Sequence, residues 1–165
     1  MEHIWAPWRL DYVVAKKPDN CILCEKRDAS DCDEANYVLY RGDHSYVLLN
    51  TFPYNSGHVM VVPYRHVSNL IDLSESEAGE LMQTARWCVE ALRETLEAGG
   101  INLGMNIGQP AGAGIDDHIH LHIVPRWNGD TNYMTTVAST RVVPQLLEES
   151  AKQLRPVIRR LAEDS

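Results

Sequence analysis

Three histidines occupy every second position of the segment DDHIHLHIVPRW, at His118, His120 and His122. In an extended strand alternate side chains point to the same face and lie roughly 6.5–7 Å apart. The pattern therefore predicts a strand over 118–124 with three imidazoles on one face and apolar residues turned toward a core. Such imidazoles can bind a metal, contact a chain of phosphates or supply a nucleophile. An exposed strand face in which histidine is incidental is the alternative.

A glycine-rich segment, QPAGAGIDD at 109–117, leads directly into these histidines. Glycine lets backbone amides approach an anion closely and adopt positive φ. The segment is not a Walker loop, since no Gly-Lys-Ser/Thr follows, and not a dinucleotide fingerprint, since a strand rather than a helix comes next. Alone it indicates an ordinary flexible loop, but beside the histidines it predicts a phosphate cradle.

The motif CILC places Cys21 and Cys24 at a spacing that suits zinc, but one such pair is half of a tetrahedral site. A thioredoxin-like redox pair is disfavoured because no strand-then-helix pattern surrounds it. Unpaired thiols remain an alternative, and Cys32 is a further candidate ligand. Four cysteines in 165 residues are too few for a disulfide scaffold. We therefore expect a reducing, cytoplasmic setting.

Length and composition indicate one domain of an ordinary globular protein, with 165 residues of which 44% are hydrophobic. No apolar run is long enough to predict a membrane-spanning helix, and the start of the chain does not resemble a secretion signal. The formal charge of −8 argues against broad binding to nucleic acid or to an acidic membrane. A local anion site remains compatible with it.

Hydrophobic patterning predicts strands alternating with two helices. Residues 37–50 indicate a hairpin, while 57–63 and 101–108 indicate further strands, the first ended by Pro63. Ser74 and Glu77 form a capping-box pattern before an amphipathic helix that Gly99-Gly100 is expected to end.

A second helix is predicted from about Val142 to the end, with a kink or break at Pro156. Residues 1–36 look irregular. The order predicts an α+β fold: an antiparallel sheet of about five strands with a long helix and a C-terminal helix.

The motif HIHLHIV, together with LLNTFPYNSGHVMVVPYRHVSNL (48–70) and NLGMNIG (102–108), resembles the histidine triad (HIT) superfamily. The resemblance covers roughly residues 37–127. It implies a HIT-like fold in a homodimer, with a HIT core at 37–127. An N-terminal segment at 1–36 containing the CxxC motif and an extension with a helix at 128–165 flank this core within a single domain.

The resemblance also implies a mechanism, because histidine triad enzymes transfer or cleave nucleoside phosphates through a covalent nucleotidyl-histidine. The middle histidine of the motif, His120, corresponds to the nucleophile. His122 is expected to contact the transferring phosphate and assist the leaving oxygen. His58, from the preceding strand, is expected to orient the catalytic histidines, with a satisfied buried histidine as the alternative.

Four positions match nucleotide-binding positions of the family. Asn50 corresponds to a contact with the ribose, and Asn106 lies where related hydrolases often place a glutamine near the phosphates. The amides near Gly112 and Gly114 would hold phosphate oxygens. For both asparagines, a side chain bonded to its own backbone is the alternative.

The cysteine pair resembles that of zinc-containing histidine triad and galactose-1-phosphate uridylyltransferase proteins. There, a histidine after the glycine-histidine strand and the first triad histidine complete the site. The resemblance implies a structural zinc on Cys21, Cys24, His66 and His118. A metal on His118 would anchor the segment that carries the nucleophile.

The segment AGAGIDD departs from the dinucleoside polyphosphate hydrolases, which tend to carry polar Gly-Gln-Thr/Ser there. It resembles instead the bacterial diadenosine tetraphosphate phosphorylases, which favours an adenine dinucleoside polyphosphate and inorganic phosphate as substrates, with ATP and ADP as products. Hydrolysis of dinucleoside polyphosphates or phosphoramidates is the alternative. Two further alternatives are a sugar-1-phosphate nucleotidylyltransferase, which usually has proline where Ile119 stands, and a non-catalytic nucleotide-binding zinc module.

Overall fold

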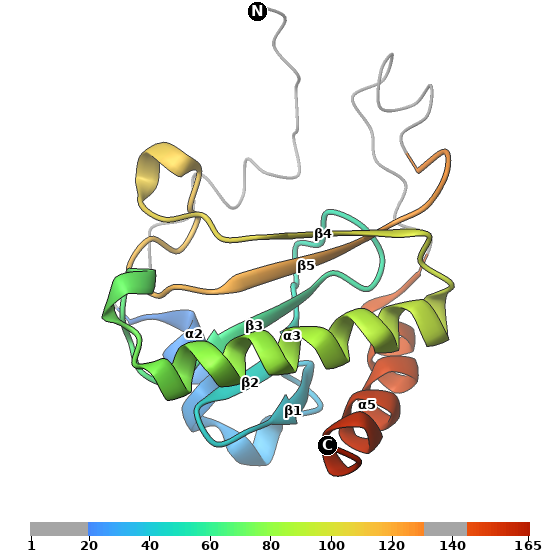
Figure 1. Ribbon diagram of the computed structural model, residues 1–165, viewed down its shortest axis with the longest axis horizontal. Coiled ribbons are helices and arrows are strands. Elements are labelled where there is room, and N and C mark those ends of the chain that lie inside the picture. Colours follow the sequence, from blue (N-terminus) through green and yellow to red (C-terminus); the bar gives the residue numbers. More distant parts are fainter. Residues whose placement is uncertain (1–19, 131–144) are drawn as a thin grey trace, which may run out of the picture.

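The computed structural model describes residues 20–130 and 145–165, which form an α+β fold around one antiparallel sheet (Figure 1). The strands are β1 (Val38–Arg41), β2 (Ser45–Leu49), β3 (Val59–Pro63), β4 (Gly100–Gly104) and β5 (Leu121–Arg126). Their order in the sheet is β1-β2-β3-β5-β4, and every neighbouring pair is antiparallel. The predicted fold class, including the five strands and both helices, is confirmed.

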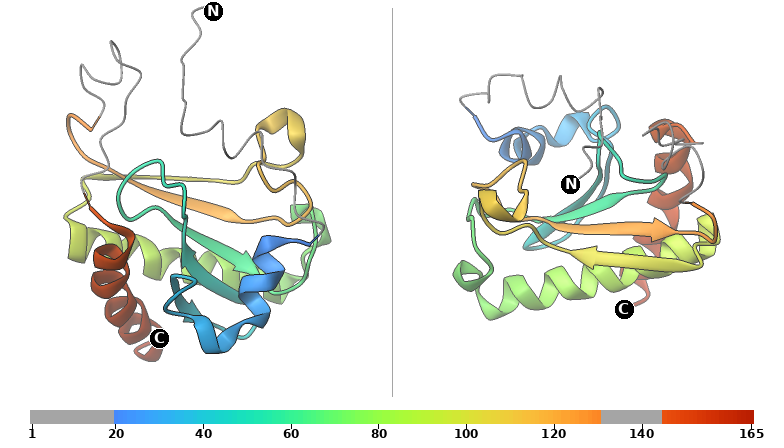
Figure 2. Two further views of the ribbon diagram at one scale, coloured as in Figure 1. Left: turned by 180° about the vertical axis from the view of Figure 1, so that it is seen from behind. Right: turned by 90° about the horizontal axis from the view of Figure 1, so that it is seen from above.

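Two long helices cover one face of the sheet, and a short helix covers part of the other (Figures 1 and 2). The long ones are α3 (Glu75–Leu96) and α5 (Leu147–Glu163), and the short one is α2 (Ile22–Asp28). Single 3₁₀ turns lie at η1 (Ser30–Cys32), η2 (Leu70–Asp72) and η3 (Gln109–Ala111). The sheet therefore separates a main core from a smaller one on the α2 side.

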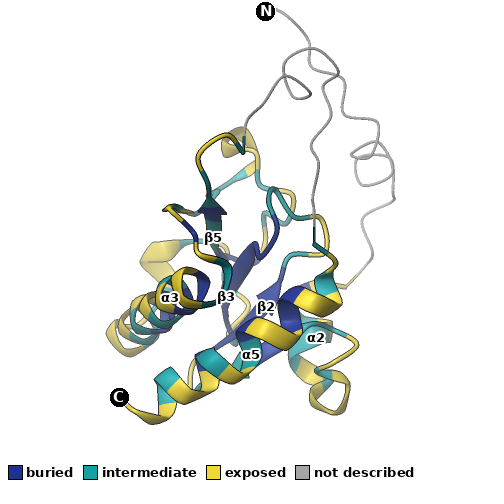
Figure 3. Cartoon of the chain, turned by 90° about the vertical axis from the view of Figure 1, so that its right-hand side faces the viewer, coloured by how far each residue is buried: buried dark blue, intermediate teal, exposed yellow. Residues whose placement is uncertain are grey.

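Period-two alternation divides the strand residues between these two cores. Leu121 and Ile123 of β5 join the main core beneath α3 and α5. Met60 and Val62 of β3 face the smaller core together with Leu23 of α2. Figure 3 shows buried strands beneath α5, whose outer face is exposed. The alternation in β5 leaves its one histidine, His122, on the α2 side of the sheet.

Helix α3 begins as predicted, but it ends for a different reason. Ser74 and Glu77 form the capping box reciprocally. The helix ends at Leu96, and Glu97 caps it in the left-handed conformation, with φ 50°. Gly100 instead pairs with Arg126 as the first residue of β4. The prediction that Gly99-Gly100 ends the helix is therefore wrong, because the sheet register places Gly100 in the strand.

Three further boundaries differ from the prediction. The CILC segment lies at the start of helix α2 rather than in an irregular loop. Helix α5 is not broken at Pro156, which lies on the exposed face, where water can bond the carbonyl that the proline leaves free. Strand β5 starts at Leu121, three residues after the predicted start, and includes Pro125. The predicted helix start near Val142 lies outside the described residues.

Gly57 precedes the buried His58 and has φ 74°, a conformation that favours glycine. A Cβ there would lie 2.4 Å from Cδ1 of Leu96 and 3.2 Å from Cδ2 of Leu92. We expect Gly57→Ala to lower the free energy of unfolding by about 1–3 kcal/mol, measured by urea denaturation.

Gly79 provides the matched control, because it lies on the exposed face of α3 and a Cβ there meets no atom of the described residues within 4 Å. We expect Gly79→Ala to raise the free energy of unfolding by roughly 0.5–1 kcal/mol. Equal effects of the two substitutions would contradict the steric argument at Gly57.

Candidate active site and metal centre

Three histidine rings meet on the α2 side of the sheet, where β3 and β5 lie next to each other. His58 immediately precedes β3, His120 immediately precedes β5, and His122 lies within β5 opposite Met60. The ring centroids of His120 and His122 are 4.7 Å apart, and those of His58 and His122 are 5.1 Å apart. The structure therefore brings together the three residues predicted to be catalytic.

The backbone fixes where the proton of His120 lies. Its Nδ1 is 2.8 Å from the carbonyl oxygen of His118, and a carbonyl oxygen only accepts hydrogen bonds. The hydrogen is therefore on Nδ1, and Nε2 keeps its lone pair. Burial lowers the pKa of His120 below its ordinary value, although the hydrogen bond to His118 opposes this shift. A neutral ring with an unprotonated Nε2 is what a nucleophilic imidazole requires.

A series of hydrogen bonds determines, in the same way, which ring nitrogen of His58 and of His122 carries the proton. The backbone N–H of Tyr54 donates to Nδ1 of His58 at 3.1 Å, so the proton of neutral His58 lies on Nε2. That Nε2–H donates to Nδ1 of His122 at 3.0 Å, which leaves His122 with its proton on Nε2. His122 thus complements His120. The Nε2 of His122 carries a hydrogen and is a donor, whereas the Nε2 of His120 has a lone pair and is an acceptor.

Both partner rings are neutral at physiological pH for a physical reason. Burial lowers the pKa of His58 to about 3, and the neighbouring His122 and His120 contribute to the shift. Burial and His120 lower the pKa of His122 to about 4. The tautomers derived from the backbone contacts therefore describe the neutral rings.

Tyr54 belongs to this cluster, although the sequence analysis did not identify it. Its ring is stacked on His58 at 4.8 Å between centroids and tilted against His122 at 5.9 Å. Its position four residues before His58 is the feature of the sequence that could have identified Tyr54. Asn50 also lies here: its Nδ2 is 3.3 Å from Nδ1 of His58, and its Oδ1 accepts from the backbone of Phe52. Asn50 thus supports His58 in addition to any contact with a nucleotide.

The remaining nucleotide-binding candidates lie on the segment between β4 and β5. Asn106 is half-buried, while Gly112 and Gly114 are exposed. Gly112 ends the η3 turn in the left-handed conformation, with φ 86°. Ile115 packs against the smaller core and holds the end of this segment against the sheet. The segment therefore leads from an exposed glycine-rich turn into the histidine cluster.

Four further side chains form a second cluster, and each offers one ligand atom: Cys21, Cys24, His66 and His118. These atoms all lie within 4.8 Å of one another. Sγ of Cys21 is 3.3 Å from Nδ1 of His118, and Sγ of Cys24 is 3.3 Å from Nδ1 of His66. Cys32 is exposed and lies outside this cluster.

The cluster fits a tetrahedral zinc ion. Bonds of about 2.3 Å to sulfur and about 2.0–2.1 Å to nitrogen place tetrahedral S and N ligands roughly 3.6 Å apart. The observed S–N distances are 3.3, 3.3 and 3.5 Å. Burial and the adjacent Cys21 raise the pKa of Cys24, a shift that a divalent cation between the sulfurs reverses. The group thus has the atoms and spacing of a Cys₂His₂ site.

The metal cluster and the catalytic cluster meet at His118. Its Nε2–H donates to the carbonyl oxygen of Pro63 at 2.9 Å, so its Nδ1 presents a lone pair to the cysteines. The prediction that all three triad histidines lie in one strand is wrong, because only His122 is within β5. His118 turns to the metal cluster instead, while its carbonyl oxygen holds His120.

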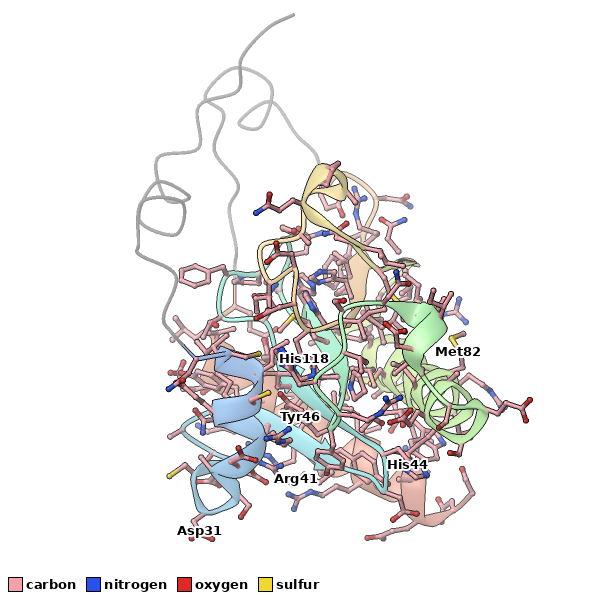
Figure 4. The ribbon with its side chains drawn as sticks, turned by 90° about the vertical axis from the view of Figure 1, so that its left-hand side faces the viewer. Asp31, Arg41, His44, Tyr46, Met82 and His118 are labelled. Carbon is pink, nitrogen blue, oxygen red and sulfur yellow. The ribbon has the colours of Figure 1, made fainter. Side chains whose placement is uncertain are left out.

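Contacts between α2 and the sheet position the two cysteines. Leu23 is buried, and its carbonyl oxygen accepts a hydrogen bond from the hydroxyl of Tyr46 at 2.7 Å. Arg41 donates to the carbonyl oxygens of Arg27 and Lys26 at the end of the helix. Figure 4 shows His118 and Tyr46 beside this helix. The helix thus brings CILC to a histidine that lies 94 residues beyond Cys24 in the chain.

Fold and site together define an α+β protein with a neutral histidine cluster and an adjacent Cys₂His₂ cluster. The HIT domain family model matches residues 33–129, which is more than half of the chain. The chain therefore belongs to the HIT family, as its triad motif indicated.

Relatives in this family carry names that concern dinucleoside polyphosphates. A protein of Mycobacterium tuberculosis named AP-4-A phosphorylase is 36% identical over 161 residues, which cover 93% of this chain and 83% of that protein. The asymmetrical bis(5'-nucleosyl)-tetraphosphatase of Schizosaccharomyces pombe is 36% identical over 93 residues, which cover 56% of this chain and 50% of that one.

A solved structure carries the metal. The crystal structure of a zinc-bound histidine triad family protein from Mycobacterium smegmatis has a TM-score of 0.71 and 28% identity. It covers 88% of this chain and 98% of its own. The Cys₂His₂ cluster of this chain is compatible with zinc by its ligand atoms and their spacing. Among the described residues, none of the helices has the length and hydropathy of a membrane span.

Proposed function

We propose that this chain is an enzyme that transfers a nucleotidyl group through a covalent adduct on His120, and that its reaction is the phosphorolysis of diadenosine tetraphosphate to ATP and ADP. The observation that carries the proposal is the state of His120: a buried neutral ring whose Nδ1–H is held by the carbonyl of His118, which leaves Nε2 free to bond to phosphorus. The phosphorylase relative, which matches 93% of the chain, supports the choice of substrate.

In the first step, Nε2 of His120 attacks the α-phosphorus of the dinucleotide. The bond from that phosphorus to its bridging oxygen breaks, and ATP leaves with the bond electrons. His122 presents Nε2–H toward the reacting groups and stabilises the charge that develops on oxygen. His58 holds the His122 tautomer, and the glycine-rich segment supplies backbone amides to the phosphates.

In the second step, inorganic phosphate attacks the adenylyl-histidine and releases ADP, which restores neutral His120. Water in place of phosphate would give AMP, so the acceptor alone distinguishes phosphorolysis from hydrolysis. Hydrolysis is the second candidate, because the tetraphosphatase relative aligns with about half of this chain at the same identity. A nucleotide-binding module without turnover would form no adduct.

The acceptor is identified by incubating the protein with diadenosine tetraphosphate and ³²P-labelled inorganic phosphate. Phosphorolysis places the label in the β-phosphate of ADP, and ATP and ADP form in equal amounts. Unlabelled AMP with ATP, formed equally fast without phosphate, would show hydrolysis. Binding of the dinucleotide without any product would favour the non-catalytic alternative.

A structural zinc on Cys21, Cys24, His66 and His118 forms part of the proposal. When bound, the ion links helix α2 to His118, which lies two residues before His120 in the chain. The side chains of the histidine cluster carry out the proton and phosphoryl chemistry.

A homodimer is also proposed, and the exposed edge of the sheet supports it. Strand β4 ends the strand order, and Leu103 is 44% exposed on it. Beside it, Met82 of α3 is 53% exposed, and both residues line a cavity of about 380 Å³. A second copy would pair with the open strand edge and cover these apolar side chains.

We expect Leu103→Lys to convert the dimer into a monomer, because the substitution places a charge at the centre of this surface. Light scattering coupled to size-exclusion chromatography measures the mass. Ile71→Lys is the control, since Ile71 is 85% exposed on η2 rather than on β4. An unchanged dimer in the Leu103 variant would place the interface elsewhere.

A further inference from the structure

Both histidines of the metal cluster have the same arrangement of ring nitrogens. Each places Nδ1 beside a cysteine sulfur, at 3.3 Å in both cases. The Nε2 of His118 faces an acceptor, the carbonyl oxygen of Pro63. The Nε2 of His66 lies 3.8 Å from Oδ2 of Asp117, which is within ion-pair range but too long for a direct hydrogen bond. A metal-bound histidine characteristically donates its second N–H to a carbonyl or carboxylate, which fixes the ring and raises its basicity.

Asp117 has a particular place in the chain as well as in space. It is the last residue of the glycine-rich segment 109–117 and directly precedes His118. Its partner His66 follows strand β3 and belongs to the metal cluster. A contact between them therefore connects the segment proposed to hold the phosphates with a residue proposed to hold the metal. Both side chains are partly exposed, so their direct attraction is small and orientation of the ring is the larger effect.

We propose that Asp117 is a positioning residue that orients His66 for the metal and ties the glycine-rich segment to the metal centre. The inference rests on the proposed zinc site. Asp117 acts through His66 rather than on the substrate, and the zinc affinity of the protein is therefore the direct readout. Loss of the carboxylate leaves all four ligand atoms in place but frees the His66 ring to rotate.

Zinc affinity is measured by competition with a chromophoric chelator at fixed pH. We expect Asp117→Ala to weaken zinc binding by about 10- to 100-fold, and Asp117→Asn, which keeps an acceptor oxygen, to weaken it less. Asp116→Ala is the matched control, which removes the same charge one residue earlier in the chain, and its affinity should equal that of the wild type. Equal affinities of the Asp116 and Asp117 variants would overturn the proposal.

A double-mutant cycle isolates the path through His66. In a His66→Ala background, Asp117→Ala should have no further effect on zinc affinity, because the ring that it orients is absent. An undiminished loss in that background would show that Asp117 acts by another route. Wild-type protein that binds no zinc would instead remove the proposed zinc site and this inference together, while the adduct on His120 remains independently testable.

Hydrogen exchange tests the second half of the proposal. Amides of residues 108–117 should exchange faster in zinc-loaded Asp117→Ala than in zinc-loaded wild type, and chelation should produce the same increase in the wild type. Exchange in helix α5, which packs on the other face of the sheet from the metal centre, reports whether the variant is folded. Unchanged exchange in 108–117 would show that the carboxylate does not tie this segment to the metal.

Discussion

Replacing His120 with alanine is expected to lower the rate of nucleotide transfer by about 10⁴-fold or more, since removal of a nucleophile disables the whole catalytic group. The variant loses the atom that bonds to phosphorus but keeps the glycine-rich segment, Asn50 and the His58–His122 pair. We therefore expect it to bind diadenosine tetraphosphate while forming no acid-labile nucleotidyl adduct. Rapid quenching followed by mass analysis of the intact protein measures the adduct directly.

His44→Ala is the matched control for this experiment. His44 is exposed on the turn between β1 and β2, where its backbone amide, rather than its ring, donates to Glu80. It should retain full adduct formation, with the same mass increase as the wild type. Adduct in the His120 variant at wild-type levels would assign the nucleophile to another residue.

Removing a metal ligand is expected to have the largest effect on stability. We expect Cys21→Ala to abolish stoichiometric zinc and to lower the free energy of unfolding by about 3 kcal/mol, since bound metal stabilises the folded state alone. For a chain of this size, that corresponds to a Tm lower by roughly 6–12 °C. Metal analysis and thermal unfolding with and without a chelator measure both quantities.

The same variant should also turn over more slowly, because His118 serves both clusters. Its ring belongs to the metal cluster, and its carbonyl oxygen holds the proton of His120 on Nδ1. Without the metal, the position of this carbonyl oxygen is less restricted. We therefore expect kcat to fall by a larger factor than KM rises. Cys32→Ala is the control: the side chain is exposed outside the cluster, so zinc content and Tm should match the wild type. Zinc retained in the Cys21 variant would exclude the proposed ligand set.

Interactions between residues that are close in the sequence account for most of the helices and strands that were predicted correctly. The capping box at Ser74 and Glu77, the apolar repeat of α3 and the alternation in β5 depend on neighbours within a few residues. The errors have a different origin. Glu97 rather than glycine ends α3 because β4 pairs Gly100 with Arg126, and strand register is a property of the whole sheet.

The sequence by itself determined which chemical groups are available: a triad motif, a cysteine pair at zinc spacing, and a glycine-rich segment directly before the triad. Residue type and spacing carry that information, because reactivity belongs to the side chain. The tertiary structure placed Nδ1 of His118 3.3 Å from Sγ of Cys21, as the resemblance implied. It alone decided that backbone groups of Tyr54 and His118 set the tautomers of His58 and His120. Those partners are backbone atoms, whose positions depend on how the chain folds rather than on which side chains it carries.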